Sequence, residues 1–381
     1  MSGLAGHMSH LHEDRHLTFG DLKCILYRAH LGKLHGVTEK LDGQNTYFTY
    51  GPFGLRFARN KSHIASGGIS LADIHAKWAD KPSVAEAFGE AYKALSQGLT
   101  VLAQWELQNI FNNGNTWYSA EIVGRLNPNV IHYDTNAVVL HRSGNHFDHL
   151  VSCVSRMQKY ISHTGWQILS PVNVSMPRCH DNEALLDAIE LINRVQGDYV
   201  NDNTLGDMFE EYLVEKHLSN LDIDDDDKLY IAELISDFDT LLTAKKPYVA
   251  NLLPKIYHAQ IHGLLKDGPK LYADFVEPIR EVFFTFGIRI LSNVQSGLIY
   301  NPANEIERLR REVEQEIANI DRSGDERSKI LLQKELSRLG DIGNVSSSIE
   351  GVVFSYNGST YKLTGSFAPI NQILGIGRYG R

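Results

Sequence analysis

One long acidic segment most constrains how this chain can fold, because it separates two stretches that favour short strands. Residues 181–345 contain 18 Lys and Arg against 32 Asp and Glu, a net charge of −14. The rest of the 381-residue chain contains 19 Lys and Arg and 14 Asp and Glu, a net charge of +5. We therefore expect the two ends to form a mildly basic core, and the acidic insertion between them to repel nucleic acid.

The acidic segment has the apolar spacing of helices. Its apolar residues recur at helical intervals in three groups, which are Leu185, Ile189 and Ile192, then Met208, Phe209, Tyr212 and Leu213, then Ile231, Leu234, Ile235 and Phe238. The charge pattern of residues 305–339 predicts a long exposed helix or a helical hairpin broken at residues 322–325. We expect these helices to pack as an antiparallel bundle. Its role would be contact with a protein partner, oligomerisation or closure as a lid.

The flanking stretches favour strands joined by tight turns. Residues 352–354 and 360–363 are β-rich runs, and the Asn-Gly pair between them is a strong hairpin signal. Residues 46–50 and 55–58 flank a Gly-Pro-Phe-Gly turn in the same way. We therefore predict an α+β fold in which a core of antiparallel sheets is interrupted by the helical insertion. Before this core, an amphipathic helix is expected to run to His30 with Thr18 as its cap.

The segment from Glu39 to Asn45 places a lysine and polar groups at one sharp turn. A lysine amine has a pKa of about 10.4 and becomes a good nucleophile only where burial or a cation lowers that value. Asp42 lies on the same side as Lys40 if the segment is extended. Gly43 lets the backbone turn and come close to a ligand. We therefore interpret Lys40 as a candidate nucleophile.

Five motifs, found in family order, resemble those of the covalent nucleotidyltransferases, the superfamily of DNA ligases, RNA ligases and mRNA capping enzymes. They are Lys40-Leu-Asp-Gly for motif I, residues 55–60 for motif Ia, 117–124 for motif III, 348–354 for motif IV and 361–365 for motif V. Residues 5–145 and 345–381 are also similar to ligase-like proteins of tailed bacteriophages. The resemblance implies a ligase-type nucleotidyltransferase core of antiparallel sheets that is ATP-grasp-like.

In that superfamily the lysine of motif I attacks the α-phosphate of ATP or GTP and becomes a lysyl-nucleotide. The resemblance implies that Lys40 is the nucleophile and that Lys362 is the cation on the α-phosphate. ATP is expected more than GTP, together with Mg²⁺ held by Glu121 and Glu350. The expected nucleotide-binding residues are Glu39, Asp42, Gly43, Asn45, Arg59, Glu121, Tyr133, Glu350 and Gly351.

Several of these roles follow from chemistry. Arg59 suits a bidentate grip on phosphate or a ribose contact, and the turn after residue 50 is expected to return it towards Lys40. Glu121 and Glu350 would hold ribose hydroxyls or metal-bound water. Tyr133, or the strand 137–140, would supply an apolar platform for adenine.

The sequence also departs from the superfamily pattern. Motif V usually has a second basic residue two positions after its lysine, where this chain has Thr364. About twenty residues follow Lys362, so we expect the OB-fold domain of DNA ligases and capping enzymes to be missing, replaced or supplied by a partner. Glu121 of motif III and Glu350 of motif IV are 229 positions apart, several times the usual spacing of these two motifs in the superfamily.

The expected domain division follows from that interval and from the charge distribution. Residues 1–180 would form the first part of the nucleotidyltransferase core, residues 181–345 the acidic helical insertion and residues 346–381 the last part of the core.

Three functions are compatible with this pattern. The first is a polynucleotide ligase that joins RNA, or less readily DNA, ends through lysyl-AMP. RNA is favoured because Asn45 stands where DNA ligases usually have an arginine. The second is a nucleotidyltransferase with another acceptor, such as an RNA cap, a protein or a small molecule. The third is a phage virion or binding protein that keeps the fold without turnover.

Two further segments suggest metal sites. Residues 222–233 place acids at positions 1, 3, 5 and 12 of a calcium-binding loop, but Asp227 stands where the loop needs glycine. A solvated acidic loop that ends at a helix N-terminus is the preferred interpretation. The cluster of His7, His10, His12 and His16 lacks the cysteine or carboxylate spacing of a zinc site.

Bulk properties suggest an enzyme of the cytoplasm, which would be the host cytoplasm if a phage encodes it. Three cysteines are too few, and odd in number, for a disulfide framework. The sequence has neither an eighteen-residue apolar run nor the layout of a signal peptide, so no membrane partner is expected.

Overall fold

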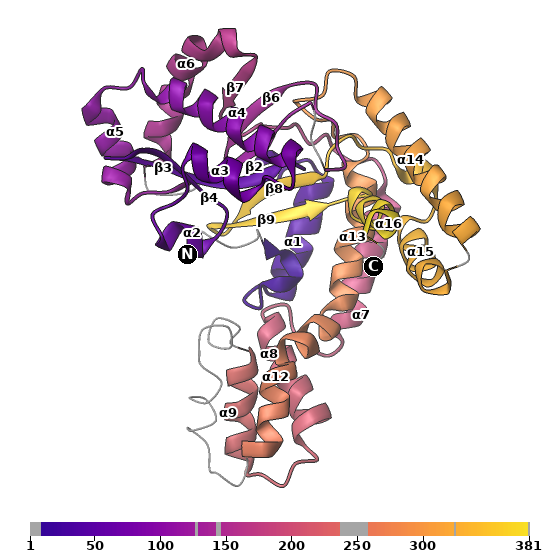
Figure 1. The fold of residues 1–381 in the computed structure, drawn as a ribbon. Coiled ribbons are helices and arrows are strands. Elements are labelled where there is room, and N and C mark those ends of the chain that lie inside the picture. Colours follow the sequence, from indigo (N-terminus) through magenta and orange to yellow (C-terminus); the bar gives the residue numbers. More distant parts are fainter. Residues whose placement is uncertain (1–8, 126–128, 142–145, 237–257, 324, 380–381) are drawn as a thin grey trace. The chain divides into compact units, whose positions relative to one another are not determined.

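The computed structural model describes residues 9–125, 129–141, 146–236, 258–323 and 325–379. The chain divides into two compact units, and Figure 1 labels most of their helices and strands. We call residues 34–177 and 290–381 the sheet unit, and residues 9–33 and 178–289 the helical unit. Both helices and sheets are present, so the predicted α+β class is confirmed.

The larger sheet of the sheet unit has five strands in the order β4-β3-β5-β6-β7. They are β3 (Gln44–Gly51), β4 (Gly54–Ala58), β5 (Tyr118–Val123), β6 (Asn136–Leu140) and β7 (Trp166–Leu169). The predicted hairpin of β3 and β4 is confirmed. Strands β6 and β7 are parallel, so the prediction of purely antiparallel sheets is wrong for this pair. A parallel pair needs a crossover, and here α6 (Phe147–Ile161) provides it.

Strands β9, β8 and β2 of the sheet unit are hydrogen-bonded in that order, and both pairs are antiparallel. Their bounds are His35–Lys40 for β2, Gly351–Tyr356 for β8 and Ser359–Thr364 for β9. The predicted hairpin is confirmed: Asn357 and Gly358 form its turn with φ values of 47° and 80°. Positive φ at both positions is the geometry that an Asn-Gly turn favours.

Helices that follow β4 and β6 cover one face of the five-stranded sheet. They are α3 (Leu71–Lys77), α4 (Pro82–Leu99), α5 (Gln104–Phe111) and α6, with the short 3₁₀ turns η2 (Asn112–Gly114) and η3 (Ser162–Thr164). The short helix α2 (Lys61–Ala65) instead packs through Ile64 against a separate small cluster of Tyr47, Ala58 and Trp117. Phe88 of α4 and Leu150 of α6 share a buried cluster with Ile122 of β5. Successive strand residues point to opposite faces, so Val123 belongs to a different cluster, on the other face.

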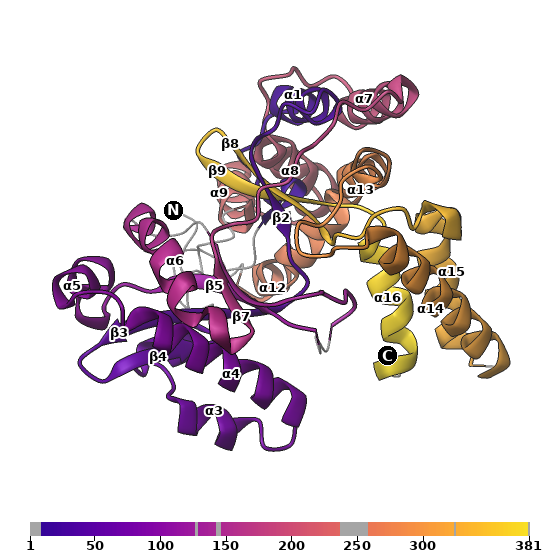
Figure 2. The ribbon, with the colours of Figure 1, turned by 90° about the horizontal axis from the view of Figure 1, so that it is seen from above.

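Three C-terminal helices contribute to that second cluster: α14 (Pro302–Ser323), α15 (Glu326–Leu339) and α16 (Phe367–Tyr379). The turn η6 (Ile342–Asn344) follows α15. Figure 2 shows the three helices grouped together. Of the two predictions for residues 305–339, the helical hairpin is confirmed, because α14 ends at Ser323 and Asp325 caps α15.

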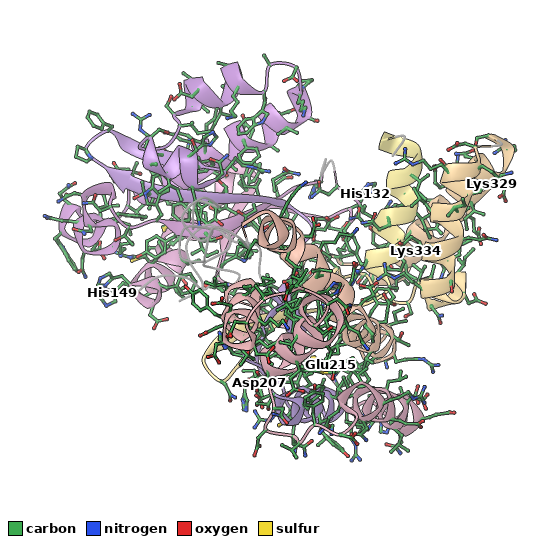
Figure 3. The ribbon with its side chains drawn as sticks, turned by 90° about the horizontal axis from the view of Figure 1, so that it is seen from below. His132, His149, Asp207, Glu215, Lys329 and Lys334 are labelled. Carbon is green, nitrogen blue, oxygen red and sulfur yellow. The ribbon has the colours of Figure 1, made fainter. Side chains whose placement is uncertain are left out.

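The helical unit is formed around a separate apolar cluster that includes Phe209, Ile231 and Tyr272. Its elements are β1 (Ser9–His10), η1 (Leu11–Glu13), α1 (Phe19–His30), α7 (Asn182–Gln196), α8 (Leu205–Leu213), the π-helix η4 (Val214–Leu218), α9 (Asp225–Ser236), α12 (His258–Phe275) and α13 (Glu277–Leu291), which continues into the sheet unit. The predicted cap of α1 is confirmed, since the Thr18 hydroxyl accepts a hydrogen bond from Asp21 N at 3.0 Å. Acidic side chains such as Asp207 and Glu215 lie on its surface (Figure 3).

The two units differ from the predicted domain boundaries. The predicted insertion, residues 181–345, is helical in the described residues, but residues 290–345 belong to the sheet unit and residues 9–33 to the helical unit. The physical reason lies in packing. Leu309 of α14 and Leu332 of α15 join the same apolar cluster as Ile370 of α16. Charge and periodicity identify helices, but they do not predict which part of the protein the apolar face of each helix packs against.

The remaining predictions concern local segments. Helix α9 begins at Asp225, so the acidic run ends at a helix N-terminus as expected. His7 and Phe238 lie outside the described residues. The three cysteines are free thiols. Among the described helices, none is both long and apolar enough to cross a membrane.

Candidate functional site

The candidate site lies where the two sheets of the sheet unit are joined by one short turn. Strand β2 ends at Lys40 and β3 begins at Gln44, so residues 41–43 connect the sheets. Lys40 is directly opposite Gly351, the first residue of β8. A Cβ at Gly351 would collide with the carbonyl oxygen of Leu363 on β9, so this position requires glycine.

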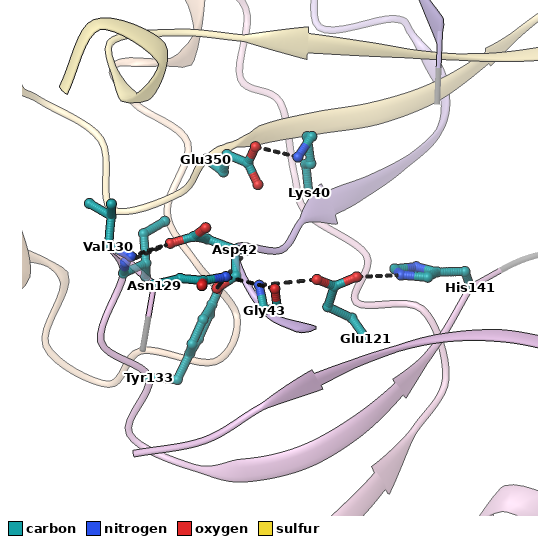
Figure 4. A network of polar contacts seen from close by, with 10 residues as sticks. Lys40, Asp42, Gly43, Glu121, Asn129, Val130, Tyr133, His141 and Glu350 are labelled. Carbon is teal, nitrogen blue, oxygen red and sulfur yellow. Dashed lines mark hydrogen bonds and ion pairs between the residues drawn. The ribbon is translucent and has the colours of Figure 1, made fainter. Parts of the chain in front are cut away.

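Lys40 and Glu350 form an ion pair between their ammonium and carboxylate groups (Figure 4). Their side chains are 22% and 16% exposed, which leaves the pair accessible to a ligand but largely desolvated. Burial raises the pKa of Glu350 to about 7, although the Lys40 ammonium opposes this shift. The carboxylates of Asp42 and Glu121 raise the pKa of Glu350 further. A nearly neutral pKa allows Glu350 to accept or release a proton at physiological pH.

Asp42 fixes the turn through backbone groups. Its carboxylate accepts hydrogen bonds from Val130 N at 2.7 Å and Ile131 N at 2.8 Å. Its own N–H donates to the hydroxyl of Tyr133 at 2.7 Å. Burial raises the pKa of Asp42, while the two backbone donors and Lys40 lower it. The tyrosine ring is buried within the apolar cluster of the C-terminal helices, so Tyr133 supports the turn and offers no free face for adenine.

Gly43 is held by Glu121, and Glu121 is held in turn by His141 (Figure 4). Gly43 N donates to one carboxylate oxygen at 3.1 Å, and Nε2 of His141 lies 3.1 Å from the other. A Cβ on Gly43 would lie 2.5 Å from the carbonyl oxygen of Ile122 and 2.7 Å from Cγ of Glu121. Glycine is therefore needed here for the close approach of the turn to β5, whereas the sequence had suggested close approach to a ligand.

Asn45 and Arg59 are exposed residues beside this network. Asn45 is paired with Glu121 across β3 and β5, so their side chains share one face of the sheet. The Arg59 guanidinium donates to Oε1 of Gln44 at 3.1 Å and lies 5.1 Å from the centre of the Phe88 ring. Desolvation lowers the pKa of Arg59, and the Glu121 carboxylate raises it. The predicted return of Arg59 towards the site is therefore seen as proximity to Gln44 and Glu121.

Lys362 lies on β9 and is paired with Val353 of β8. Val353 is in turn paired with Thr38, two residues before Lys40 on β2. Because side chains alternate along a strand, Lys362 and Lys40 are on the same face of the three strands.

Glu39 lies on the opposite face of β2 from Lys40 and is buried, with 4% of its surface exposed. Its carboxylate accepts hydrogen bonds from the Ser296 hydroxyl at 2.5 Å and from Gly297 N at 2.9 Å. Burial raises its pKa to about 7, and both hydrogen bonds lower it. Glu39 therefore joins β2 to residues 296–297, so the predicted contact between its side chain and a nucleotide is not what this arrangement favours.

Few side chains at the site could bind a metal ion. In the described part of the chain, no three His, Cys, Asp or Glu side chains converge as a metal cluster would. Mg²⁺ usually needs only one or two protein carboxylates and keeps several waters. The pair predicted to hold it, Glu121 and Glu350, is close enough for the charge of Glu121 to raise the pKa of Glu350.

Sequence reasoning missed three residues of this network. His141 directly follows β6, and its position after a buried strand was the only available signal. Asn129 donates from Nδ2 to the Gly43 carbonyl at 2.7 Å. Ser296, which bonds to Glu39, lies 257 positions from it. Neither of these last two has a local pattern that marks it.

Comparisons of the chain with protein-family models, with curated proteins and with solved structures found no match.

Proposed function

We propose that this chain is an ATP-dependent nucleotidyltransferase that forms a lysyl-AMP intermediate at Lys40, and that it acts as a polynucleotide ligase. The observation that carries the proposal is the pairing of Lys40 with Glu350. Lys40 is the last residue of β2 and Glu350 directly precedes the paired strand β8, so two motif-like segments more than 300 positions apart are in ionic contact. This arrangement places Glu350 where it can accept a proton from Lys40.

The first step follows from this geometry. The Lys40 ammonium gives a proton to the Glu350 carboxylate, which frees the lone pair of Nζ. That lone pair forms a bond to the α-phosphorus of ATP as the bond to the oxygen that bridges to the β-phosphate breaks. Pyrophosphate leaves with that electron pair, and the nitrogen bonded to phosphorus releases its second proton to water. Lys362, on the same strand face as Lys40, would stabilise the negative charge that develops at the α-phosphate.

The other residues bind and orient the nucleotide. The backbone of Gly43 allows close approach, and Asn45 and Arg59 offer donors to ribose hydroxyls or phosphate. Glu121, together with Glu350 before it takes up the proton of Lys40, would hold Mg²⁺, which would supply further positive charge beside the triphosphate.

The acceptor in this proposal is a 5′-phosphate on an RNA end, with a DNA end as the less favoured choice. The support is the amide side chain of Asn45, exposed and paired with Glu121 at the site. AMP would pass from Lys40 to that phosphate, and a 3′-hydroxyl would then displace AMP. A protein, an RNA cap or a small molecule as acceptor, and a virion protein that binds without turnover, are the competing outcomes of the test.

The experiment is covalent labelling of the purified full chain with α-³²P-ATP or α-³²P-GTP and Mg²⁺, followed by a denaturing gel. Lys40→Arg is the informative variant, because it retains a cation beside Glu350 but lacks a usable nucleophile. Lys93→Arg, at an exposed ion pair of α4, is the matched control. Label on the wild type and the control but not on Lys40→Arg supports the proposal. Folded, nucleotide-free wild type that takes no label contradicts it.

Ligation of 5′-phosphorylated RNA and DNA strands then identifies the acceptor. Joined RNA supports the ligase assignment. Lysyl-AMP that forms but transfers to neither strand would instead favour a different acceptor.

A further inference from the structure

Residues 129–133 form a bridge of backbone groups beside the lysine turn. Val130 N and Ile131 N both donate to the Asp42 carboxylate, and Asn129 holds the Gly43 carbonyl through its side chain. The position of the turn that follows Lys40 is therefore set by the position of this segment.

Two charged residues at the start of α14 hold the same segment from another side. Oε1 of Glu305 accepts a hydrogen bond from His132 N at 2.9 Å. Nη2 of Arg308 donates to the Val130 carbonyl at 2.6 Å, and its Nε donates to Glu305 at 2.8 Å. The side chains of Glu305 and Arg308 are only 6% and 18% exposed. Buried charges of this kind are tolerated because each is paired and hydrogen-bonded.

We propose that the Glu305–Arg308 pair is a positioning clamp for the lysine turn, acting through the backbone of residues 130–132. This proposal rests on the proposed function of Lys40. The pair contacts the backbone of residues 130–132 and acts on Lys40 only through that segment. Glu305 and Arg308 are therefore positioning residues and not catalytic ones.

The clamp has a rigid support. Leu309 and Val313 of α14 are buried in the apolar cluster that also contains Val130, Ile131 and Leu41. Apolar packing thus fixes the helix against the segment, and the two charged residues fix the orientation of the backbone amides that bind Asp42. Small displacements of a reacting group lower rates strongly, so the clamp affects the rate of attack by Lys40.

The test uses single-turnover labelling of the full chain at a series of ATP concentrations, which separates the maximal rate from half-saturation. The double variant Glu305→Gln/Arg308→Met keeps an oxygen for His132 N and removes the donor to Val130 O. It also takes away the ion-pair partner of Glu312, whose side chain is 33% exposed and can therefore be solvated by water. Arg308→Lys keeps the charge but loses the forked geometry. The matched control is Glu335→Gln/Arg338→Met, which alters a buried pair with the same spacing on α15.

The expected result is a maximal rate about 10- to 100-fold lower in the double variant, because the nucleophile is displaced. The half-saturating ATP concentration should change by less than about twofold, since nucleotide contacts are retained. Arg308→Lys should recover part of the rate, and the control should label like the wild type. Hydrogen exchange at the amides of Val130 and Ile131 should become faster in the double variant only, which shows a loosened segment in a folded protein.

Two results would overturn the clamp. One is a folded double variant that labels at the wild-type rate. The other is unchanged exchange at Val130 and Ile131. Failure of the proposed function is a separate observation, because there the wild type itself takes no label.

Discussion

Gly43 and Glu121 are joined where β3 meets β5: the glycine N–H donates to the glutamate carboxylate at 3.1 Å, and no space remains for a side chain on the glycine. One hydrogen bond thus fixes both the lysine turn and the orientation of an acidic group. His141 binds the second oxygen of that carboxylate, so rotation of Glu121 is restricted from two directions.

Gly43→Ala should destabilise the fold and suppress labelling. Its Cβ would lie 2.5 Å from the Ile122 carbonyl oxygen, which belongs to the backbone of a buried strand and cannot move cheaply. Overpacking of this kind costs about 1–3 kcal/mol. Urea denaturation and labelling with α-³²P-ATP measure the two effects. Gly263→Ala is the control, because an added Cβ there meets no atom within 4 Å. If Gly43→Ala had the stability and labelling of the wild type, the close approach of Gly43 to the backbone of β5 would be contradicted.

The rate of lysyl-AMP formation should depend on the ionisation of Glu350. Burial raises its pKa to about 7. If Glu350 accepts the proton of Lys40, only its ionised form is active, so the rate should fall about tenfold per pH unit below that value. Above it, the dependence on Glu350 should level off. Labelling rates at saturating ATP from about pH 5.5 to pH 8.5 test this.

Glu350→Gln should lose both the activity and this part of the profile. Glu190→Gln, an exposed carboxylate of α7, is the control and should keep them. A wild-type rate that does not change across this range would remove Glu350 from the proton transfer.

Glu39 should make the protein less stable as the pH rises. Its ordinary pKa is 4.5 and burial raises the folded-state value to about 7, so the folded state binds a proton more tightly than the unfolded state. The contribution is most favourable below about pH 4.5 and is lost as the pH rises to about 7. A shift of this size corresponds to about 3 kcal/mol.

The measurement is the free energy of unfolding of wild type and Glu39→Gln by urea at several pH values between these limits. The variant should gain stability relative to the wild type as the pH rises, because its amide cannot ionise. A constant difference between the two proteins at every pH would show that Glu39 is ionised in the folded state throughout. Glu190→Gln again serves as the control.

Local sequence alone determined much of this protein. The Asn357-Gly358 turn has positive φ at both positions, which few other residue pairs allow. These two residues were therefore enough to predict the hairpin of β8 and β9. The cap at Thr18 and the break before Asp325 are likewise decided within a few residues. Such features depend on interactions between residues that are close in the sequence, so they do not depend on how the rest of the chain folds.

Part of the candidate site could also be predicted. Lys40, Asp42, Gly43, Glu121 and Glu350 do converge: Lys40 is paired with Glu350, Gly43 donates to Glu121, and Asp42 and Glu121 both raise the pKa of Glu350. The resemblance that grouped them supplied their identity but not their contacts.

Tertiary structure decided the rest. Asp42 was expected on the same side as Lys40 and is close enough for Lys40 to lower its pKa, but the hydrogen bonds that fix its carboxylate come from the backbone amides of Val130 and Ile131. Glu39 was expected at the nucleotide, yet it is bonded to Ser296, 257 positions away. Burial, and therefore the raised pKa of both Glu39 and Glu350, arises only when distant segments exclude water around these carboxylates. The sequence shows which groups can ionise, but the packing of the folded chain sets their pKa values.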